Sequence, residues 1–111
     1  MNTKHTQAYE KIKQEMRRGT VILAALSQLS EAQYGYSLIQ SLNEKGYEIG
    51  QDTLYPLLRR LEQQGLLDSE WRVEDPRPRR YYTLNAVGQE VLNLLIADWK
   101  NQENVLRSLL S

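Results

Sequence analysis

Cysteine is absent from this chain of 111 residues, which excludes disulfide bonds, thiolate nucleophiles and thiolate metal sites together. Long apolar runs are missing too, because the longest, Val21 to Leu26, is far too short to span a bilayer. The residues before Gly19 are polar where a secretory signal needs an apolar stretch, so we expect a cytoplasmic protein that is not exported.

An excess of charge of one sign is also lacking. Lysine and arginine together number 14, as do aspartate and glutamate, so the formal net charge is zero. This balance argues against a protein that coats polyanions without selectivity, but it does not exclude a local basic face.

Residues with catalytic chemistry are scarce. His5 is the one histidine, and no residues at metal-ligand spacing accompany it. Glu74 and Asp75 are adjacent carboxylates, but they stand beside an expected turn, where acidic residues are ordinary. The sequence has no phosphate-cradling glycine loop and no nucleophile elbow. We therefore expect neither an enzyme nor a metal or cofactor site.

The composition, with 41% apolar and 25% charged residues, is typical of a single globular domain. Over residues 7–18 the spacing predicts a polar amphipathic helix with one apolar stripe, formed by Ala8, Ile12 and Met16. A separate and more apolar helix is expected over residues 20–29, buried in the core. A turn follows over residues 30–33.

Helical spacing returns over residues 34–45, where Gly46 is a natural C-terminal stop. The next helix is expected to begin at Asp52 as its N-cap and to end at Gly65, with Pro56 in its first turn. Its inner face consists of leucines, at positions Leu54, Leu57, Leu58 and Leu61.

The apolar period changes after Gly65. Residues 66–74 and 79–84 alternate as two strands, and the segment between them, DPRP, reads as the turn of a β-hairpin. A final helix is expected from Ala86 to the end of the chain, with Asn85 as its N-cap.

These elements predict a mainly α fold with a small β-hairpin, arranged as a winged helix-turn-helix with flanking helices. We expect a single domain over 1–111. It divides into an N-terminal helix at 1–18, the winged helix-turn-helix core at 19–84, and a C-terminal dimerisation helix at 85–111.

The helix that follows Gly50 has the place of a recognition helix, which lies in the DNA major groove. Its exposed positions carry side chains suited to base edges or phosphates, namely Gln51, Thr53, Tyr55 and Arg59. The same spacing fits the solvated face of an ordinary amphipathic helix equally well.

The expected hairpin tip is rich in arginine. From Pro76 to Tyr82 the chain carries Arg77, Arg79 and Arg80 and no acidic residue. Arginines at a proline-stiffened tip suit phosphate contact or insertion into a narrow minor groove. The alternative is a solvated turn, but a recognition-type helix and an arginine-tipped hairpin together favour a winged helix that binds DNA.

Several segments follow one another in order from about Arg18 to Leu95: RGTVILAALS, YGYSLIQSL, DTLYPLLRRLEQQGLL, SEW and RRYYTLNAVGQEVL. The most specific are the run TLYP-x-L-x-R-L-E-x-x-G-L and the later R-x-YY-x-L-x-x-x-G. In this order the segments resemble the PadR family of winged-helix transcriptional regulators.

The resemblance implies a homodimeric bacterial repressor that binds a two-fold operator and releases it on meeting a small molecule. It also implies a set of DNA-facing residues: Tyr36, Thr53, Tyr55, Arg59, Arg79 and Arg80. This chain departs from many relatives at Asp52, where they have glycine and where a carboxylate would repel a nearby phosphate. Arginines replace the lysines often found in family wings.

The last helix carries an apolar seam with alternating spacings of three and four, along Leu92, Leu95, Trp99, Gln102, Leu106 and Leu109. A small domain cannot fully cover such a seam, so we expect it to pair with a second copy of the chain through Leu92, Leu95, Leu106 and Leu109. The alternative is that the seam folds back on its own domain. The resemblance is to the smaller subfamily, whose single C-terminal helix pairs with the partner's N-terminal helix.

Trp99 has two interpretations. It is either an aromatic anchor in the dimer interface or a stacking platform for a planar aromatic or phenolic effector. The residues alone favour the anchor, whereas the platform comes from the resemblance, since some members of the subfamily have a tryptophan here that lines a cavity at the dimer centre. Asp98 would then supply charge for a cationic ligand, with Met16 and Ile12 in the cavity wall.

A competing hypothesis is a winged-helix module that binds another protein and never touches DNA. Such a module has no need of Arg77, Arg79 and Arg80 beside Tyr55 and Arg59. The arginines therefore favour operator DNA as the partner.

Overall fold

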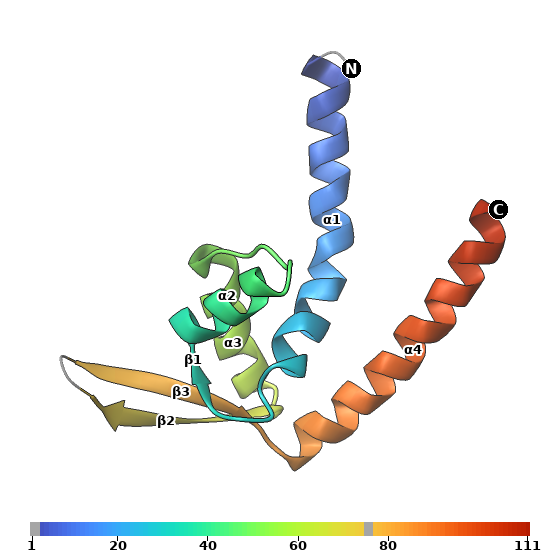
Figure 1. Ribbon diagram of the computed structural model, residues 1–111. Coiled ribbons are helices and arrows are strands. Elements are labelled where there is room, and N and C mark those ends of the chain that lie inside the picture. The colour runs from blue at the N-terminus through green and yellow to red at the C-terminus, as the bar shows by residue number, and fades with distance from the viewer. Residues whose placement is uncertain (1–2, 75–76) are drawn as a thin grey trace.

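A computed structural model describes residues 3–74 and 77–111 of the chain (Figure 1). Its elements, in chain order, are α1 (Thr3–Ser27), β1 (Gln33–Tyr34), α2 (Gly35–Glu44), α3 (Gln51–Gln63), β2 (Leu67–Val73), β3 (Pro78–Leu84) and α4 (Ala86–Leu110). The predicted fold class, mainly α with a small β-hairpin, is confirmed. The expected turn at DPRP lies partly outside the described residues, because residues 75–76 are not among them.

The core forms around the leucine face of α3. Leu54, Leu57, Leu58 and Leu61 are between 0% and 5% exposed, as their spacing predicts. They pack in one cluster with buried leucines of neighbouring elements, Leu26, Leu29, Leu38, Leu42, Leu67 and Leu92. Burying one leucine side chain stabilises the fold by about 1.5–3 kcal/mol, so this cluster fixes where α3 sits.

The hairpin is part of a three-stranded antiparallel sheet with the strand order β1-β3-β2. The strand β1 was not expected, because two residues are too few to show an alternating pattern. It pairs Gln33 with Tyr82 and Tyr34 with Tyr81, and the rings of Tyr34 and Tyr81 meet edge to face at 5.3 Å between centroids. The start of α2 is thereby fixed to the hairpin.

The first helix is longer than expected. The prediction of two helices, over residues 7–18 and 20–29, is wrong, because α1 runs unbroken through Gly19 and ends at Ser27. A glycine inside an exposed helix lowers the stability of the helix by about 1 kcal/mol relative to alanine. It does not end the helix unless it adopts a positive φ. Among the described residues, positive φ occurs at Gly46 and Gly65, which follow α2 and α3 as expected.

The start of α3 also differs from the prediction. Gly50 is the N-cap, and Asp52 lies in the first turn without capping the helix. Pro56 consequently falls beyond the first turn, where its missing N–H removes the bond that another residue would donate to the carbonyl of Asp52. By contrast, the cap of α4 is as predicted, since Asn85 Oδ1 accepts a 2.8 Å hydrogen bond from the backbone N–H of Gly88.

The long helices α1 and α4 leave the winged core and diverge towards the two termini (Figure 1). Their projecting parts expose large apolar side chains, which are Tyr9, Ile12 and Met16 on α1 and Leu94, Trp99, Val105, Leu106, Leu109 and Leu110 on α4. Within residues 3–74 and 77–111, no helix combines the length and apolar character needed to cross a membrane.

Gly88 lies at the junction between the hairpin and α4, where any side chain is expected to lower the stability of the fold. A Cβ at this buried position would overlap the backbone carbonyl oxygen of Leu66 and approach Leu84. We expect Gly88→Ala to lower the free energy of unfolding by about 1–3 kcal/mol, measured by chemical denaturation at constant protein concentration.

Gly19→Ala is the matched control, because a Cβ at exposed Gly19 meets nothing within 4 Å. It removes a glycine from a helix interior and is expected to add about 0.5–1 kcal/mol to the free energy of unfolding. Equal stability of Gly88→Ala and the unaltered protein would contradict the tight packing at this junction.

Candidate nucleic-acid interface

A groove of about 700 Å³ lies between the start of α2, one flank of α3 and the hairpin. Its lining includes every predicted DNA-contacting residue except one: Tyr36, Gln51, Tyr55, Arg59, Arg77, Arg79 and Arg80. Thr53 lies on the opposite flank of α3 and faces a second hollow, beside α1. The fold therefore brings most of the predicted set onto one surface, which we call the wing groove.

Tyr55 lines the wing groove where α3 meets the first residue of α2. Its ring packs on Gly35, where any Cβ would overlap the ring. Glycine at this first position of α2 lets the tyrosine lie flat against the helix start. Tyr36, the next residue, is 56% exposed, and its hydroxyl accepts a 3.1 Å hydrogen bond from Gln40 Nε2.

Arg80 joins the hairpin to α3. Its Nη2 lies 2.6 Å from Glu62 Oε1, and its Nε donates a 3.0 Å hydrogen bond to Ser69 Oγ. The Ser69 hydroxyl in turn donates to the other oxygen of Glu62. The guanidinium also lies near two aromatic rings, 5.9 Å from the centroid of Trp71 and 5.5 Å from that of Tyr82. These contacts fix the angle between the wing and α3.

Arg79 joins the hairpin to α2. Its guanidinium lies 4.4 Å from the ring centroid of Tyr34, the residue that precedes α2, and its Nη1 lies 3.8 Å from Glu74 Oε2. Sequence reasoning treated Arg79 and Arg80 as free cations. Both have carboxylate partners. Glu74 and Arg79 are the residues that flank the expected turn, so the predicted hairpin already placed them near each other, whereas nothing in the sequence indicated the pair of Arg80 with Glu62.

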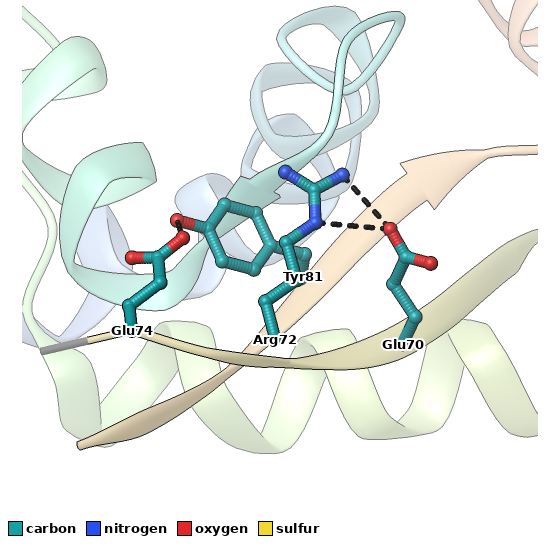
Figure 2. Close-up of polar contacts among 4 residues, drawn as sticks. All are labelled: Glu70, Arg72, Glu74 and Tyr81. Carbon is teal, nitrogen blue, oxygen red and sulfur yellow. Dashed lines mark hydrogen bonds and ion pairs between the residues drawn. The ribbon is translucent and has the colours of Figure 1, made fainter.

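The face of the hairpin that carries Arg79, opposite Trp71 and Arg80, holds a second polar chain (Figure 2). Tyr81 donates a 2.5 Å hydrogen bond to Glu74, and the guanidinium of Arg72 lies 4.1 Å from the ring centroid of Tyr81. Arg72 is held there by hydrogen bonds of 3.0 and 2.8 Å to Glu70 Oε1. This chain braces the wing from the side that faces away from Trp71 and Arg80.

Two wing tyrosines stay protonated at neutral pH. The hydrogen bond to Glu74 raises the pKa of Tyr81 above its ordinary value, with burial adding to the effect. Burial raises the pKa of Tyr82. Neither ring therefore brings a negative charge to the wing.

Arg59 and Arg77 differ from the other arginines of the wing groove. Both are exposed, and neither forms a hydrogen bond or ion pair with any residue that the structure describes. Their guanidinium N–H groups are therefore free to meet an anion from outside. Of the predicted set, these two are the uncompensated cations.

Sequence reasoning missed Trp71 and Val73 on the wing. Trp71 is 66% exposed and lines the wing groove, and Val73 is 91% exposed. The strand alternation could have indicated them, because it places Ser69, Trp71 and Val73 on one face of β2. Exposed apolar side chains on a wing can pack against sugars or base edges in a DNA groove.

The residues predicted for dimerisation and effector binding lie on the long helices. Leu92 is 6% exposed within the chain's own core, which leaves it little surface for a partner, and Leu95 packs partly against the same core. Further along α4, Leu106 and Leu109 are exposed, and Trp99 is 44% exposed beside exposed Asp98. Ile12 and Met16 are exposed on α1, which diverges from α4 (Figure 1).

Comparison with known proteins gives consistent matches. The profile of the transcriptional regulator PadR-like family matches residues 22–94. A curated transcriptional regulator of Mycobacterium tuberculosis is 42% identical over 79 residues, which cover 70% of this chain and 74% of the relative.

Solved structures extend the similarity to the flanking helices. A PadR family transcriptional regulator from Eggerthella lenta superposes with a TM-score of 0.92 at 41% identity, covering 99% of this chain and 98% of that one. A PadR-like transcription factor from Bacteroides fragilis superposes with a TM-score of 0.76 at 34% identity, covering 89% and 98%. With its winged helix, its wing groove and these matches, the chain belongs to the PadR-like family of transcriptional regulators, which are not enzymes.

Proposed function

We propose that the chain is a cytoplasmic, sequence-specific operator-binding repressor that acts as a homodimer and responds to a small aromatic molecule. The observation that carries the DNA-binding part is the wing groove. It gathers hydroxyl, amide and guanidinium groups from α2, α3 and the hairpin on one surface. These are the groups that contact phosphates and base edges in DNA complexes.

In this proposal α3 enters the major groove and the hairpin lies against the neighbouring backbone and minor groove. Gln51 and Arg59 are the residues that read base edges from α3, because glutamine pairs with adenine and arginine with guanine. Arg77 contacts the backbone beside the wing. Arg79 and Arg80 hold the wing at its angle and offer their remaining N–H groups to phosphates.

The dimer proposal rests on uncovered apolar surface. The exposed stripe of α1 and the exposed seam of α4 beyond Leu95 are too apolar to face water over such a length. A second copy would cover both if its α4 packed between them. Because Leu92 belongs to the core, the intermolecular seam is centred on Trp99, Leu106 and Leu109.

The effector proposal rests on Trp99. Two such rings facing each other across the two-fold axis would sandwich a planar ligand, and Asp98 would add charge for a cation. Ile12 and Met16 would enter the wall only if the partner's helices bring them near Trp99. The proposal therefore requires the dimer.

DNA binding is tested by removing the two uncompensated arginines separately. We expect Arg59→Ala and Arg77→Ala each to weaken binding to the DNA upstream of the chain's own gene by roughly 1–3 kcal/mol. Each should also reduce the slope of log affinity against log salt by about one if its arginine contacts a phosphate. Fluorescence anisotropy across a salt series measures both quantities.

Arg107→Ala is the control, since Arg107 is an exposed arginine on α4 paired with Glu103 at 2.7 Å. It should leave DNA affinity unchanged. Arg79→Ala combined with Arg80→Ala should also weaken binding, but that change removes the links of the wing to α2 and α3 as well as two charges. Absence of any salt-dependent DNA binding by the unaltered protein would favour a protein-binding module instead.

Effector binding is tested at Trp99. We expect Trp99→Ala to abolish the tryptophan quenching that proflavine, a planar cationic dye, causes on binding, because the stacking surface is lost. Trp71 also emits, so Trp71→Tyr protein should retain quenching through Trp99. Dye affinity that survives Trp99→Ala would rule out the platform and leave Trp99 as an interface anchor.

A further inference from the structure

Glu62 places a negative charge on the face of α3 that is proposed to meet DNA. It follows Arg59 by three residues and Tyr55 by seven, so the three side chains share one face of the helix. Tyr55 and Arg59 line the wing groove, and Glu62 continues their face towards the end of α3. A carboxylate on this face repels a nearby phosphate, so it opposes DNA binding unless a cation compensates it.

Arg80 of β3 is the cation that compensates Glu62. Its Nη2 lies 2.6 Å from Glu62 Oε1, and its Nε donates a 3.0 Å hydrogen bond to Ser69 Oγ, which donates to Glu62 Oε2. The Nε–H and one Nη2–H form a single edge of the planar guanidinium, and this ring of three side chains occupies that edge. Nη1, on the other edge, donates no hydrogen bond within residues 3–74 and 77–111.

The ion pair lies at the surface of the wing groove, where DNA can reach it. The side chain of Arg80 is 37% exposed and that of Glu62 is 25% exposed. A phosphate that contacts the free edge of the guanidinium meets a cation whose charge is already balanced by Glu62. Arg80 therefore brings oriented N–H donors to the wing groove but no net positive charge.

Non-specific and specific DNA complexes depend on Glu62 in opposite ways. Non-specific binding is driven by cations that neutralise phosphates, so a carboxylate beside Arg80 weakens it. Specific binding also needs α3 and the wing at a fixed angle, which Glu62 holds through Arg80 and Ser69. The same carboxylate thus lowers the affinity for DNA in general and supports the complex in which α3 and the wing act together.

We propose that Glu62 is a specificity-determining residue, whose carboxylate limits the affinity of the wing groove for unrelated DNA while it holds the wing in place to read the operator. It acts through Arg80 and is a positioning residue rather than a DNA contact. This inference rests on the proposed function, because it concerns selectivity at the same surface.

Glu62→Gln tests the proposal in the full chain, because the amide keeps an oxygen that accepts from Arg80 but carries no charge. Fluorescence anisotropy is measured across a salt series with the DNA upstream of the chain's own gene and with a duplex of the same length and shuffled sequence. We expect affinity for the shuffled duplex to rise by at least about threefold, and its salt slope to steepen by up to about one. The upstream DNA should gain less, because a neutral hydrogen bond holds the wing less firmly, so the ratio of the two affinities falls.

The direction of the change separates this role from a purely structural one. A residue that only stabilised the wing would, when altered, weaken binding to both duplexes. Weaker or unchanged binding of the shuffled duplex by Glu62→Gln, or an affinity ratio that does not fall, would overturn the inference and leave the proposed function standing. Absence of salt-dependent DNA binding by the unaltered protein would overturn both.

Arg80→Gln tests whether the effect passes through the ion pair. Alone, it leaves the carboxylate of Glu62 unpaired beside DNA, so we expect weaker binding to the shuffled duplex. Combined with Glu62→Gln it removes one charge of each sign, and affinity for the shuffled duplex should return to within about threefold of the unaltered protein. A combined variant that binds as tightly as Glu62→Gln alone would overturn the assignment of Arg80 as the residue through which Glu62 acts.

Glu103→Gln is the matched control, since it removes the carboxylate that lies 2.7 Å from Arg107 on α4 and changes the net charge by the same amount. It should leave both affinities unchanged. An equal rise in affinity for the shuffled duplex would mean that overall charge, and not the position of Glu62, causes the effect, and would overturn the inference. Thermal unfolding of each variant verifies that the fold is retained.

Discussion

The ion pair between Arg80 of the hairpin and Glu62 of α3 is the constraint on which the proposed DNA-reading surface depends. It is 2.6 Å long, half-shielded from solvent and shared with Ser69, so the wing cannot swing away from α3 without leaving a carboxylate unpaired. Arg79 makes a similar link to Tyr34 at the start of α2. A helix and a wing that meet DNA together need a fixed relative angle, and these two arginines provide it.

This arrangement changes how the charge balance of the chain is understood. In the sequence the hairpin tip is wholly basic, because no acidic residue lies between Pro76 and Tyr82. In the fold, however, Glu62 of α3 pairs with Arg80 and Glu74 pairs with Arg79. Arg59 and Arg77 therefore carry the uncompensated positive charge at the wing groove. A surface with few free cations and many oriented polar groups suits selective recognition of a site better than general attraction to DNA.

Local signals in the sequence were enough to predict the leucine face of α3, the hairpin, the Asn85 cap and the end of α2 before Gly46. Features that depend on contacts between distant residues were not predictable in the same way. The strand β1 exists only because β3 is beside it, and Glu62 becomes a neighbour of Arg80 only after α3 and the hairpin pack together. Two local preferences were wrong guides: α1 continues through Gly19, which does not adopt a positive φ, and α3 begins at the Gly50 cap, two residues before Asp52.

In the proposed function, two copies of this chain read DNA with α3 and the wing acting as one unit. Hydroxyl-radical footprinting of the full chain on the DNA upstream of its own gene tests it most directly. We expect two protected half-sites on one face of the duplex, with centres about 10 base pairs or a multiple of one helical turn apart, each flanked by protection from the wing. Uniform protection along the fragment, a single isolated half-site, or no protection at all would contradict the account.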